Sequence, residues 1–282
     1  MKPDNTAFAI RHSLDLNCDL AQSWGAYKHA AEEELLAYVS SVNIACGGHA
    51  GDPPSIMAAL KAAKDHHLNV GAHIGFPDLG SFGRREFRLD YDELNAYIAA
   101  QLGLLAGMAK SYGITLTHFR PHGAMYFRCA IDPQFAEILA KAVARFSGWL
   151  TFVGPAGSYL AEIKDKVGIK VAGEVHLDRP YRKDGSLLKF PNQKTVSFET
   201  ALSQARSLIY EQRAILEGGK TMRFNFRTIH LNMDRIYSVN LAQQVHQMLK
   251  QGKALGSLED NSYFSNAVIE DLQEKVAYRI HH

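Results

Sequence analysis

The sequence predicts a parallel α/β domain and, within that class, a (β/α) barrel. Seven short β-like runs alternate with apolar segments of helical length along the 282 residues, which is the pattern of βαβ units in a parallel sheet. Polar residues of the kinds used in catalysis fall at the ends of several runs. The alternative is a doubly wound sheet, but no GxGxxG follows the first run, where such a sheet usually binds its ligand. We therefore expect a single barrel domain of seven parallel strands over residues 1–282.

The expected strands are short, mainly apolar runs. They comprise residues 13–19, 41–47, 68–74, 117–123, 148–154, 169–175 and 228–234. Residues 53–67, 90–113 and 132–146, which lie between some of these runs, have the apolar periodicity of helices. Asp52 before Pro53-Pro54 and Asp132 before Pro133 are expected to cap the helices at 53–67 and 132–146. Gly113 is expected to end the helix at 90–113. Residues 179–195 are rich in Pro, Gly and Lys and are expected to form a surface excursion.

The composition argues against several classes of protein. The chain is 46% hydrophobic and 21% charged with a formal net charge of +2, and it has no long basic run, so we expect no nucleic-acid partner. The most apolar stretch, residues 96–109, contains Gln101 and is too short to cross a bilayer, so we expect no membrane partner. The three cysteines form no CxxC motif, and the N-terminus lacks the apolar core of a signal peptide. Both observations favour a cytoplasmic protein.

Polar side chains mark the ends of the expected strands. Asp15, Asn17 and Asp19 alternate with apolar residues in the first run, so a period of two places all three on one side of the strand. A parallel strand is buried on both faces, and an inward row of carboxylates therefore indicates a function. The other candidates in or just after later runs are His49, His73, Arg120, His122, Glu174 and His230. A parallel barrel gathers the C-terminal ends of its strands at one face, so we expect one cleft to contain Asp15, His49, His73 and His122.

The residues alone leave the chemistry of this set open. Histidines with an aspartate can hold a divalent metal, and Asp15, His49 and His73 would then be the ligands, although their spacing matches no motif such as HExxH. The same groups also serve as general acids and bases or as hydrogen-bond donors to a substrate. Arginines near them would clamp a small anion through a carboxylate or phosphate, and the candidates are Arg84, Arg85 and Arg120. No P-loop and no nucleophile elbow is present, so the chain alone has no recognised nucleotide site.

Several segments of the sequence resemble successive blocks of the LamB/YcsF family. They are DLNCDL, NIACGGHAGDP, GAHIGFPDLGSFGRR, RPHGAMY and EVHLDRPYRKDGSL, and the resemblance runs from Asp15 to about Leu188, with weaker agreement through His230. It implies an irregular (β/α) barrel related to carbohydrate deacetylases and glycoside hydrolases. It also implies a component of 5-oxoprolinase, which uses ATP to open the lactam ring of 5-oxoproline and give glutamate. Two partner subunits similar to allophanate hydrolases would complete that enzyme.

The chain departs from the family pattern at three places. Ala-Gln-Ser at residues 21–23 stands where the family usually has Gly-Glu-Gly, so Gln22 replaces an acidic group. Arg120 replaces the usual lysine before Pro-His-Gly, and a guanidinium keeps its charge and cannot act as a proton-transfer amine. The sequence HLNMD separates His230 from Asp234, where the family usually reads His-Gly-Asp.

These features lead to hypotheses of different classes. In the first, the chain is a hydrolase component with Asp15 or Asp19 as the base that prepares water and His122 as proton donor or oxyanion stabiliser. Glu174 is a further catalytic candidate, and the substrate-binding candidates are Asn17, His49, His73, Arg84, Arg85, Arg120 and His230. In the second, the chain is a non-catalytic or divergent binding subunit, which the loss of the acid at Gln22 favours. A metal-dependent, deacetylase-like hydrolase acting on another amide is a further alternative.

Overall fold

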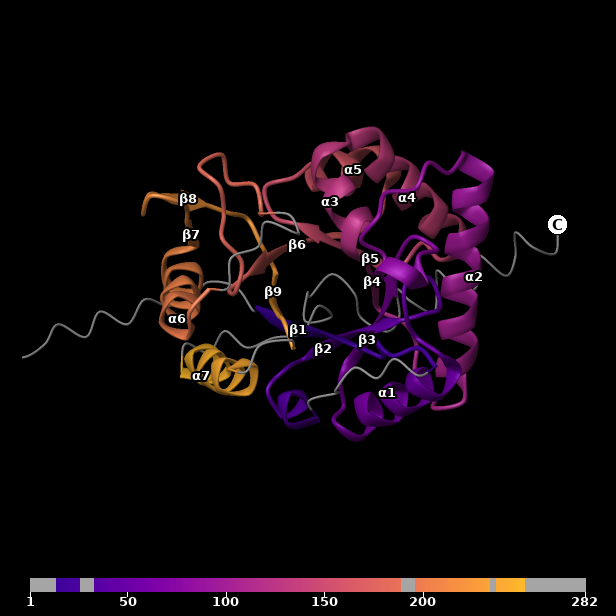
Figure 1. Ribbon diagram of the computed structural model, residues 1–282, viewed down its shortest axis with the longest axis horizontal. Helices are drawn as coiled ribbons and strands as arrows, with labels where there is room; N and C mark the ends of the chain where they lie inside the picture. Colours follow the sequence, from indigo (N-terminus) through magenta and orange to yellow (C-terminus); the bar gives the residue numbers. More distant parts are fainter. Residues whose placement is uncertain (1–13, 26–32, 189–195, 234–236, 252–282) are drawn as a thin grey trace, which may run out of the picture.

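Seven parallel strands close into a barrel (Figure 1). The computed structural model describes residues 14–25, 33–188, 196–233 and 237–251. In order around the barrel, the strands are β1 (Asp15–Leu20), β2 (Ser41–Ala45), β3 (Asn69–Ile74), β4 (His118–Pro121), β5 (Thr151–Pro155), β6 (Val171–His176) and β9 (Thr228–Leu231). The ring closes where β1 pairs with β9 and Asn17 lies beside His230. The expected seven-stranded barrel is confirmed, and closure excludes the doubly wound alternative.

Helices cover the outside of the barrel (Figure 1). They are α1 (Pro53–Asp65), α2 (Tyr91–Lys110), α3 (Gly123–Ile131), α4 (Pro133–Phe146), α5 (Leu160–Val167), α6 (Phe198–Arg206) and α7 (Ser238–Gln251). Asp52 caps α1 by accepting a hydrogen bond from the Ser55 N–H at 2.9 Å, and Asp132 caps α4 by accepting one from Phe135 at 2.9 Å. Both caps are as expected from the Asp-Pro pairs, which fix where each helix begins.

The C-terminal end of α2 follows the expectation for Gly113. The Gly113 N–H donates to the Lys110 carbonyl and the Ile114 N–H donates to the Ala109 carbonyl, each at 3.1 Å. Gly113 has a φ of 68°, a conformation that costs glycine little and that closes a Schellman motif. The chain then turns directly into β4.

Short elements complete the fold. Two 3₁₀ helices, η1 (Glu33–Ala37) and η2 (Leu79–Ser81), and one π turn, η3 (Ser207–Glu211), lie between the larger elements. An antiparallel hairpin of β7 (Arg213–Ile215) and β8 (Thr221–Arg223) was not expected, because three-residue strands carry too little period-two signal. In the expected excursion at 179–195, residues 179–188 form an irregular loop held by a bridge from Tyr181 to Leu187 and another to Leu216. Residues 189–195 lie outside the described part of the chain.

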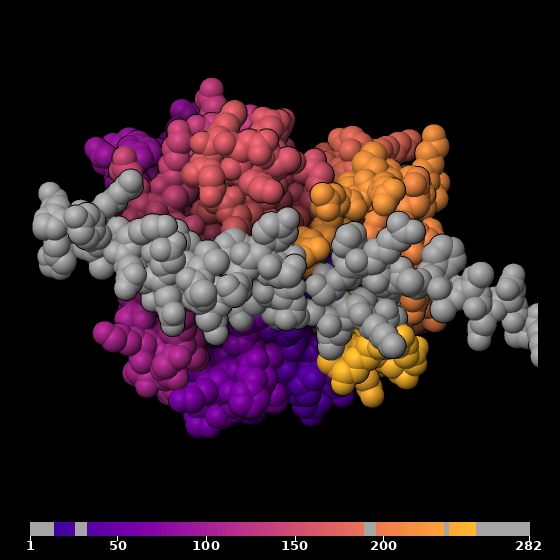
Figure 2. All heavy atoms as spheres, turned by 180° about the vertical axis from the view of Figure 1, so that it is seen from behind, coloured from indigo at the N-terminus to yellow at the C-terminus, as the bar shows by residue number. Residues whose placement is uncertain are grey.

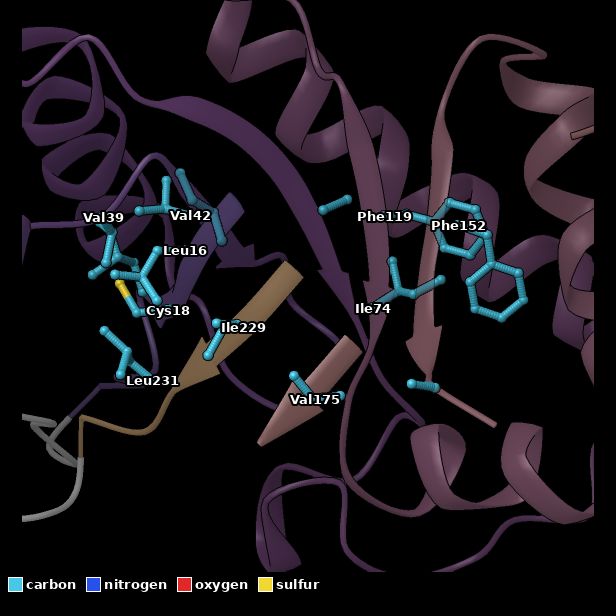
Figure 3. Packing of buried hydrophobic residues seen from close by; sticks show 14 of the residues in the cluster. Leu16, Cys18, Val39, Val42, Ile74, Phe119, Phe152, Val175, Ile229 and Leu231 are labelled. Atoms are coloured by element: carbon cyan, nitrogen blue, oxygen red, sulfur yellow. The ribbon is translucent and has the colours of Figure 1, made fainter. Parts of the chain in front are cut away.

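The apolar core lies between the barrel and its helices. Outward-facing strand residues such as Leu16, Val42 and Ile229 are fully buried against the helical layer (Figure 3). Phe119 on β4 and Phe152 on β5 stack with ring centroids 4.7 Å apart. Burial of these side chains supplies the main favourable term for folding, so the outer faces of the strands account for the stability of the barrel.

The inside of the barrel is polar, in contrast to its outer faces. The inward-facing residues are Asp15, Asn17, Asp19, Ser41, Asn43, His73, His118, Arg120, Glu174, His176, Thr228 and His230. Buried polar groups destabilise a fold unless they are hydrogen-bonded. Here they bond across strands, for example from Asn43 Nδ2 to Asn17 Oδ1 at 2.8 Å and between His118 Nε2 and Asn43 Oδ1 at 2.9 Å.

The later part of the chain gathers at one side of the molecule. In the view from behind, the orange and yellow residues from α6 to α7 lie together, apart from the violet and magenta residues of α1 and α2 (Figure 2). None of the helices in the described ranges is long and apolar enough to cross a membrane.

Candidate active site at the mouth of the barrel

Strand β1 carries its three polar residues at three different depths. Their side chains share the inward face, but each step of two residues advances about 6.6 Å along the strand. Asp15 begins the strand at the N-terminal end of the barrel, where the Ser40 hydroxyl donates to it at 2.7 Å and the Ser41 hydroxyl at 2.8 Å. Asp15 therefore does not share a cleft with the histidines, and that expectation was wrong. The period of two correctly predicts which face of the strand these side chains share, but it does not predict how far along the barrel each one lies.

Asn17 lies one level higher and is also enclosed. Its amide donates to Thr228 Oγ1 at 2.6 Å and to Glu174 Oε1 at 3.2 Å. The side chain is 1% exposed and spans the barrel interior instead of facing a pocket. As a substrate-binding candidate, Asn17 is thus placed below the site, where it supports Glu174.

The environment of Asp15 predicts a pH-dependent stability. Burial raises its pKa from 3.8 to about 6, although hydrogen bonds from Thr228, Ser40 and Ser41 oppose the shift. Proton binding to the folded state is therefore stabilising, fully so below pH 3.8, and the contribution is lost as the pH rises through about 6. Between pH 4 and pH 7, the free energy of unfolding of Asp15→Asn should rise by about 3 kcal/mol relative to that of the wild type. Urea unfolding across this pH range measures the difference. A difference between variant and wild type that does not change with pH would contradict the raised pKa of Asp15.

Asp19 occupies the mouth of the barrel at the C-terminal end of β1. Its Oδ2 lies 3.2 Å from His73 Nε2, 3.2 Å from His230 Nε2 and 3.3 Å from Arg120 Nη1. Burial favours the neutral acid, but the charges of Arg120, His73 and His230 hold the pKa of Asp19 well below its usual value. Asp19 is therefore an ionised carboxylate placed where the strand ends converge.

Arg120 is bound from within the barrel by two carboxylates. Its Nε and Nη2 donate to Glu174 at 2.8 and 2.7 Å, and its Nη1 reaches Asp19 at 3.3 Å. Burial opposes ionisation of Glu174, yet Arg120 and His176 hold the pKa of this carboxyl well below its usual value. Glu174 is 1% exposed and lies behind the pocket. Arg120 therefore fixes Asp19 and Glu174 from the barrel interior while also lining the pocket.

Removing Arg120 should leave two buried carboxylates without their partner. Arg120→Met is expected to lower the free energy of unfolding by about 3–5 kcal/mol, the usual effect of breaking a buried ion pair. The control is Arg85→Met, since the Arg85 side chain is 65% exposed and its ion pair with Asp78, at 2.6 Å, lies outside the pocket. Its loss should change stability much less. Equal losses in urea unfolding would contradict the role given to Arg120.

Three histidines pack together beside Asp19. His49 follows β2, His73 lies in β3, and His122 precedes α3. The rings of His49 and His122 stack with centroids 3.6 Å apart, and the His73 ring meets the His122 ring edge-on at 4.8 Å. Glycine makes this packing possible, because a Cβ on Gly75 would lie 2.5 Å from His49 Nδ1 and one on Gly83 would lie 2.8 Å from His122 Cδ2.

Backbone carbonyls determine the protonated nitrogens of two of these rings. His73 Nδ1 lies 3.1 Å from the Arg120 carbonyl and His122 Nε2 lies 2.8 Å from the Phe82 carbonyl, and a carbonyl only accepts. Burial, followed by the neighbouring His73, lowers the pKa of His122 well below its usual value, so His122 is neutral. Its Nδ1 lone pair then faces His73 Nε2 at 2.9 Å. Two ring nitrogens that face each other in this way suit a cation between them.

The same geometry fits a divalent metal. Ligand atoms of His49, His73 and His122 all lie within 4.8 Å of one another, and Asp19 Oδ2 lies 3.2 Å from His73 Nε2. Metal-binding histidines usually donate their other N–H to a carbonyl or carboxylate, as His73 and His122 do here. Both ring nitrogens of the buried His49 lack a hydrogen-bond partner within the described part of the chain. The expected ligand set is therefore corrected, with His122 in place of Asp15.

A pocket opens above this cluster. Its lining comprises Asp19, Gln22, Phe82, Arg84, Arg120, His122, Gly123, Tyr126, Phe127, His176, Arg179, His230 and Asn232. The structure thus brings five of the site candidates to the pocket wall, namely Asp19, Arg84, Arg120, His122 and His230. His49, His73 and Glu174 lie behind it. Arg85 is held instead by Asp78, which caps η2.

Sequence reasoning missed four polar groups in this wall. Tyr126 lies in α3, His176 ends β6, and Arg179 and Asn232 follow strand ends. The Tyr126 hydroxyl lies 3.1 Å from His176 Nε2. The expected sixth strand ended one residue before His176. The position of His176 at the C-terminal end of a parallel strand was the signal that would have identified both His176 and the nearby Arg179.

Comparison with known proteins gives one consistent result. Residues 14–260 match the family model described as the LamB/YcsF family. A protein of Geobacillus kaustophilus, named as the A subunit of 5-oxoprolinase, is 38% identical over 240 residues, covering 84% of this chain and 93% of the relative. The Bacillus subtilis protein of the same name is 35% identical over 239 residues, covering 84% and 93%. The crystal structure of a lactam utilization protein from Thermus thermophilus superposes with a TM-score of 0.79 at 33% identity, covering 87% of this chain and 99% of that one.

Proposed function

The chain belongs to the LamB/YcsF family, and on that premise we propose that it is a component of a 5-oxoprolinase that opens the lactam C–N bond of 5-oxoproline. One observation of the site carries this proposal. The ionised Asp19 is held against three histidines in a pocket whose wall also carries arginines. This arrangement combines a group that prepares water with groups that bind an anionic lactam.

The roles of the residues follow from which donors remain available. Asp19 would orient the attacking water and accept its proton. His122 uses both ring nitrogens, toward Phe82 and His73, so its role as a proton donor is better assigned to His230. His230 lines the pocket, and its Nε2 lies 3.2 Å from Asp19 Oδ2. His230 would then transfer the proton to the lactam nitrogen as the C–N bond breaks.

A metal, if present, would be held by His49, His73 and His122 with Asp19 beside them. It would polarise the carbonyl of the lactam or the attacking water. The residues would still perform the positioning described above, since Arg120 and Asn43 hold Asp19 independently of any cation.

ATP and partner subunits complete the proposal. The chain has no P-loop, so the nucleotide would be bound by partners, which we propose to be two allophanate-hydrolase-like subunits. The relatives are named as one lettered subunit of 5-oxoprolinase, which supports an assembly of several chains. In the activating step, the γ-phosphoryl group of ATP would be transferred to the lactam carbonyl oxygen with release of ADP, which makes the carbonyl carbon more electrophilic before water attacks. The acyl phosphate that remains when the C–N bond breaks would then be hydrolysed to glutamate and phosphate.

The test is glutamate formation from 5-oxoproline by this chain with its partner subunits and ATP. Product is expected only when this chain, the partners and ATP are all present. Glutamate formation without this chain would contradict the proposal. A second candidate, a metal-dependent amide hydrolase, is favoured by the convergent histidine nitrogens. It would instead act without ATP and lose activity on treatment with a chelator.

A further inference from the structure

The pocket contains three guanidinium groups in different situations. Arg120 is enclosed and bonded to Glu174 and Asp19. Arg84 is exposed at the wall, with its Cζ 5.3 Å from the centroid of the Phe82 ring. Arg179 is partly buried and also lines the pocket. Arg179 is thus less exposed to water than Arg84, and it lines the pocket together with Arg120.

The loop that carries Arg179 is rigidly held at both ends. It leaves β6 at His176, whose backbone N–H donates to the Tyr181 hydroxyl at 2.8 Å. Tyr181 is 3% exposed, and its carbonyl accepts from the Glu217 N–H at 2.8 Å. Pro180 restricts the backbone between these anchors. A side chain on such a loop is positioned before a ligand arrives, which lowers the entropic cost of binding.

The charges around Arg179 favour an anion in the pocket. Among the lining residues, the guanidinium groups of Arg84, Arg120 and Arg179 outnumber the one carboxylate, Asp19, while Glu174 and Asp178 are buried outside the lining. Burial lowers the pKa of Arg179, and Arg120 adds to this while Asp178 opposes it. A guanidinium nevertheless stays charged in proteins. A ligand carboxylate would add to the negative charge that Asp178 already supplies beside Arg179 and would accept two parallel hydrogen bonds.

We propose that Arg179 binds the carboxylate of the lactam substrate and makes the site selective for anionic over uncharged lactams. This inference rests on the proposed function, because it assigns the orientation of that substrate. With the carboxylate on Arg179, from the loop after β6, the lactam ring extends toward Asp19 on β1 and His230 on β9.

Calorimetry on the full chain with 5-oxoproline and with its uncharged carboxamide tests the inference. The wild type should bind 5-oxoproline about 10- to 100-fold more tightly, the usual effect of a charge-assisted hydrogen-bonded pair. Arg179→Gln should lose that preference while its affinity for the carboxamide changes little. Arg179→Lys, which keeps the charge but not the planar fork, should retain part of it. Arg85→Gln is the matched control and should bind like the wild type.

The outcomes separate this inference from the proposed function. A wild type that binds neither compound contradicts the proposed function. A wild type that prefers 5-oxoproline, with a folded Arg179→Gln that keeps the same preference, overturns the role of Arg179 alone. Thermal unfolding confirms that the variant is folded, and if Arg179→Gln does not fold, a full wild-type preference in Arg179→Lys counts against the bidentate clamp.

Discussion

Replacing Asp19 by asparagine is expected to lower the turnover of 5-oxoproline by roughly 10⁴-fold, the upper end of what one positioned proton-transfer group contributes. Asparagine has nearly the same shape but cannot accept the proton of water. It also weakens the contacts with His73, His230 and Arg120, which all converge on Oδ2. The loss should appear in kcat more than in KM, because the carboxylate acts mainly in the transition state. The assay is glutamate formation with ATP and the partner subunits.

Asp15→Asn is the matched control for this experiment. It makes the same chemical change on the same face of the same strand, but at the closed N-terminal end of the barrel. Turnover should stay near that of the wild type. If Asp15→Asn reduced turnover as strongly as Asp19→Asn, the active site would not lie at the mouth.

Gln22→Glu is expected to raise turnover by roughly 10²–10⁴-fold, the contribution of a restored acid or base. Gln22 stands where the LamB/YcsF pattern usually has glutamate, and it lines the same pocket as His122. Glutamine and glutamate are nearly isosteric, so the fold and the affinity for 5-oxoproline should change little. The gain should therefore appear in kcat, measured with the partner subunits and ATP.

The result decides the role of position 22. No gain in turnover for Gln22→Glu would show that the acid is supplied by another residue.

The fold was largely predictable because its signals are local. Each β-like run formed a strand, and the Asp-Pro pairs at Asp52 and Asp132 began their helices as capping chemistry requires. The rule that parallel strands end at one face also brought Asp19, His122 and His230 to one pocket. These outcomes depend on periodicity and chain direction, which a sequence shows directly.

The errors concern quantities that a sequence does not show. The depth of Asp15 in the barrel depends on where β1 begins relative to its neighbours. The pairing of Arg85 with Asp78, and of Arg120 with Glu174 across 54 positions of sequence, depends on competition among partners in space. Each arginine stays a predicted anion clamp, and its bond to a carboxylate is a contact that residue type alone does not show. Arg179 was overlooked because it begins the segment 179–195, whose Pro-, Gly- and Lys-rich composition predicted a surface excursion.

The most direct test of this account is a crystal structure of the chain with 5-oxoproline. The lactam is expected in the pocket at the C-terminal ends of the strands, with its carboxylate on the Arg179 guanidinium and its ring carbonyl facing Asp19 and His230. A lactam bound elsewhere on the barrel, or bound in this pocket with its carboxylate turned away from Arg179 and its carbonyl away from Asp19, would contradict the account.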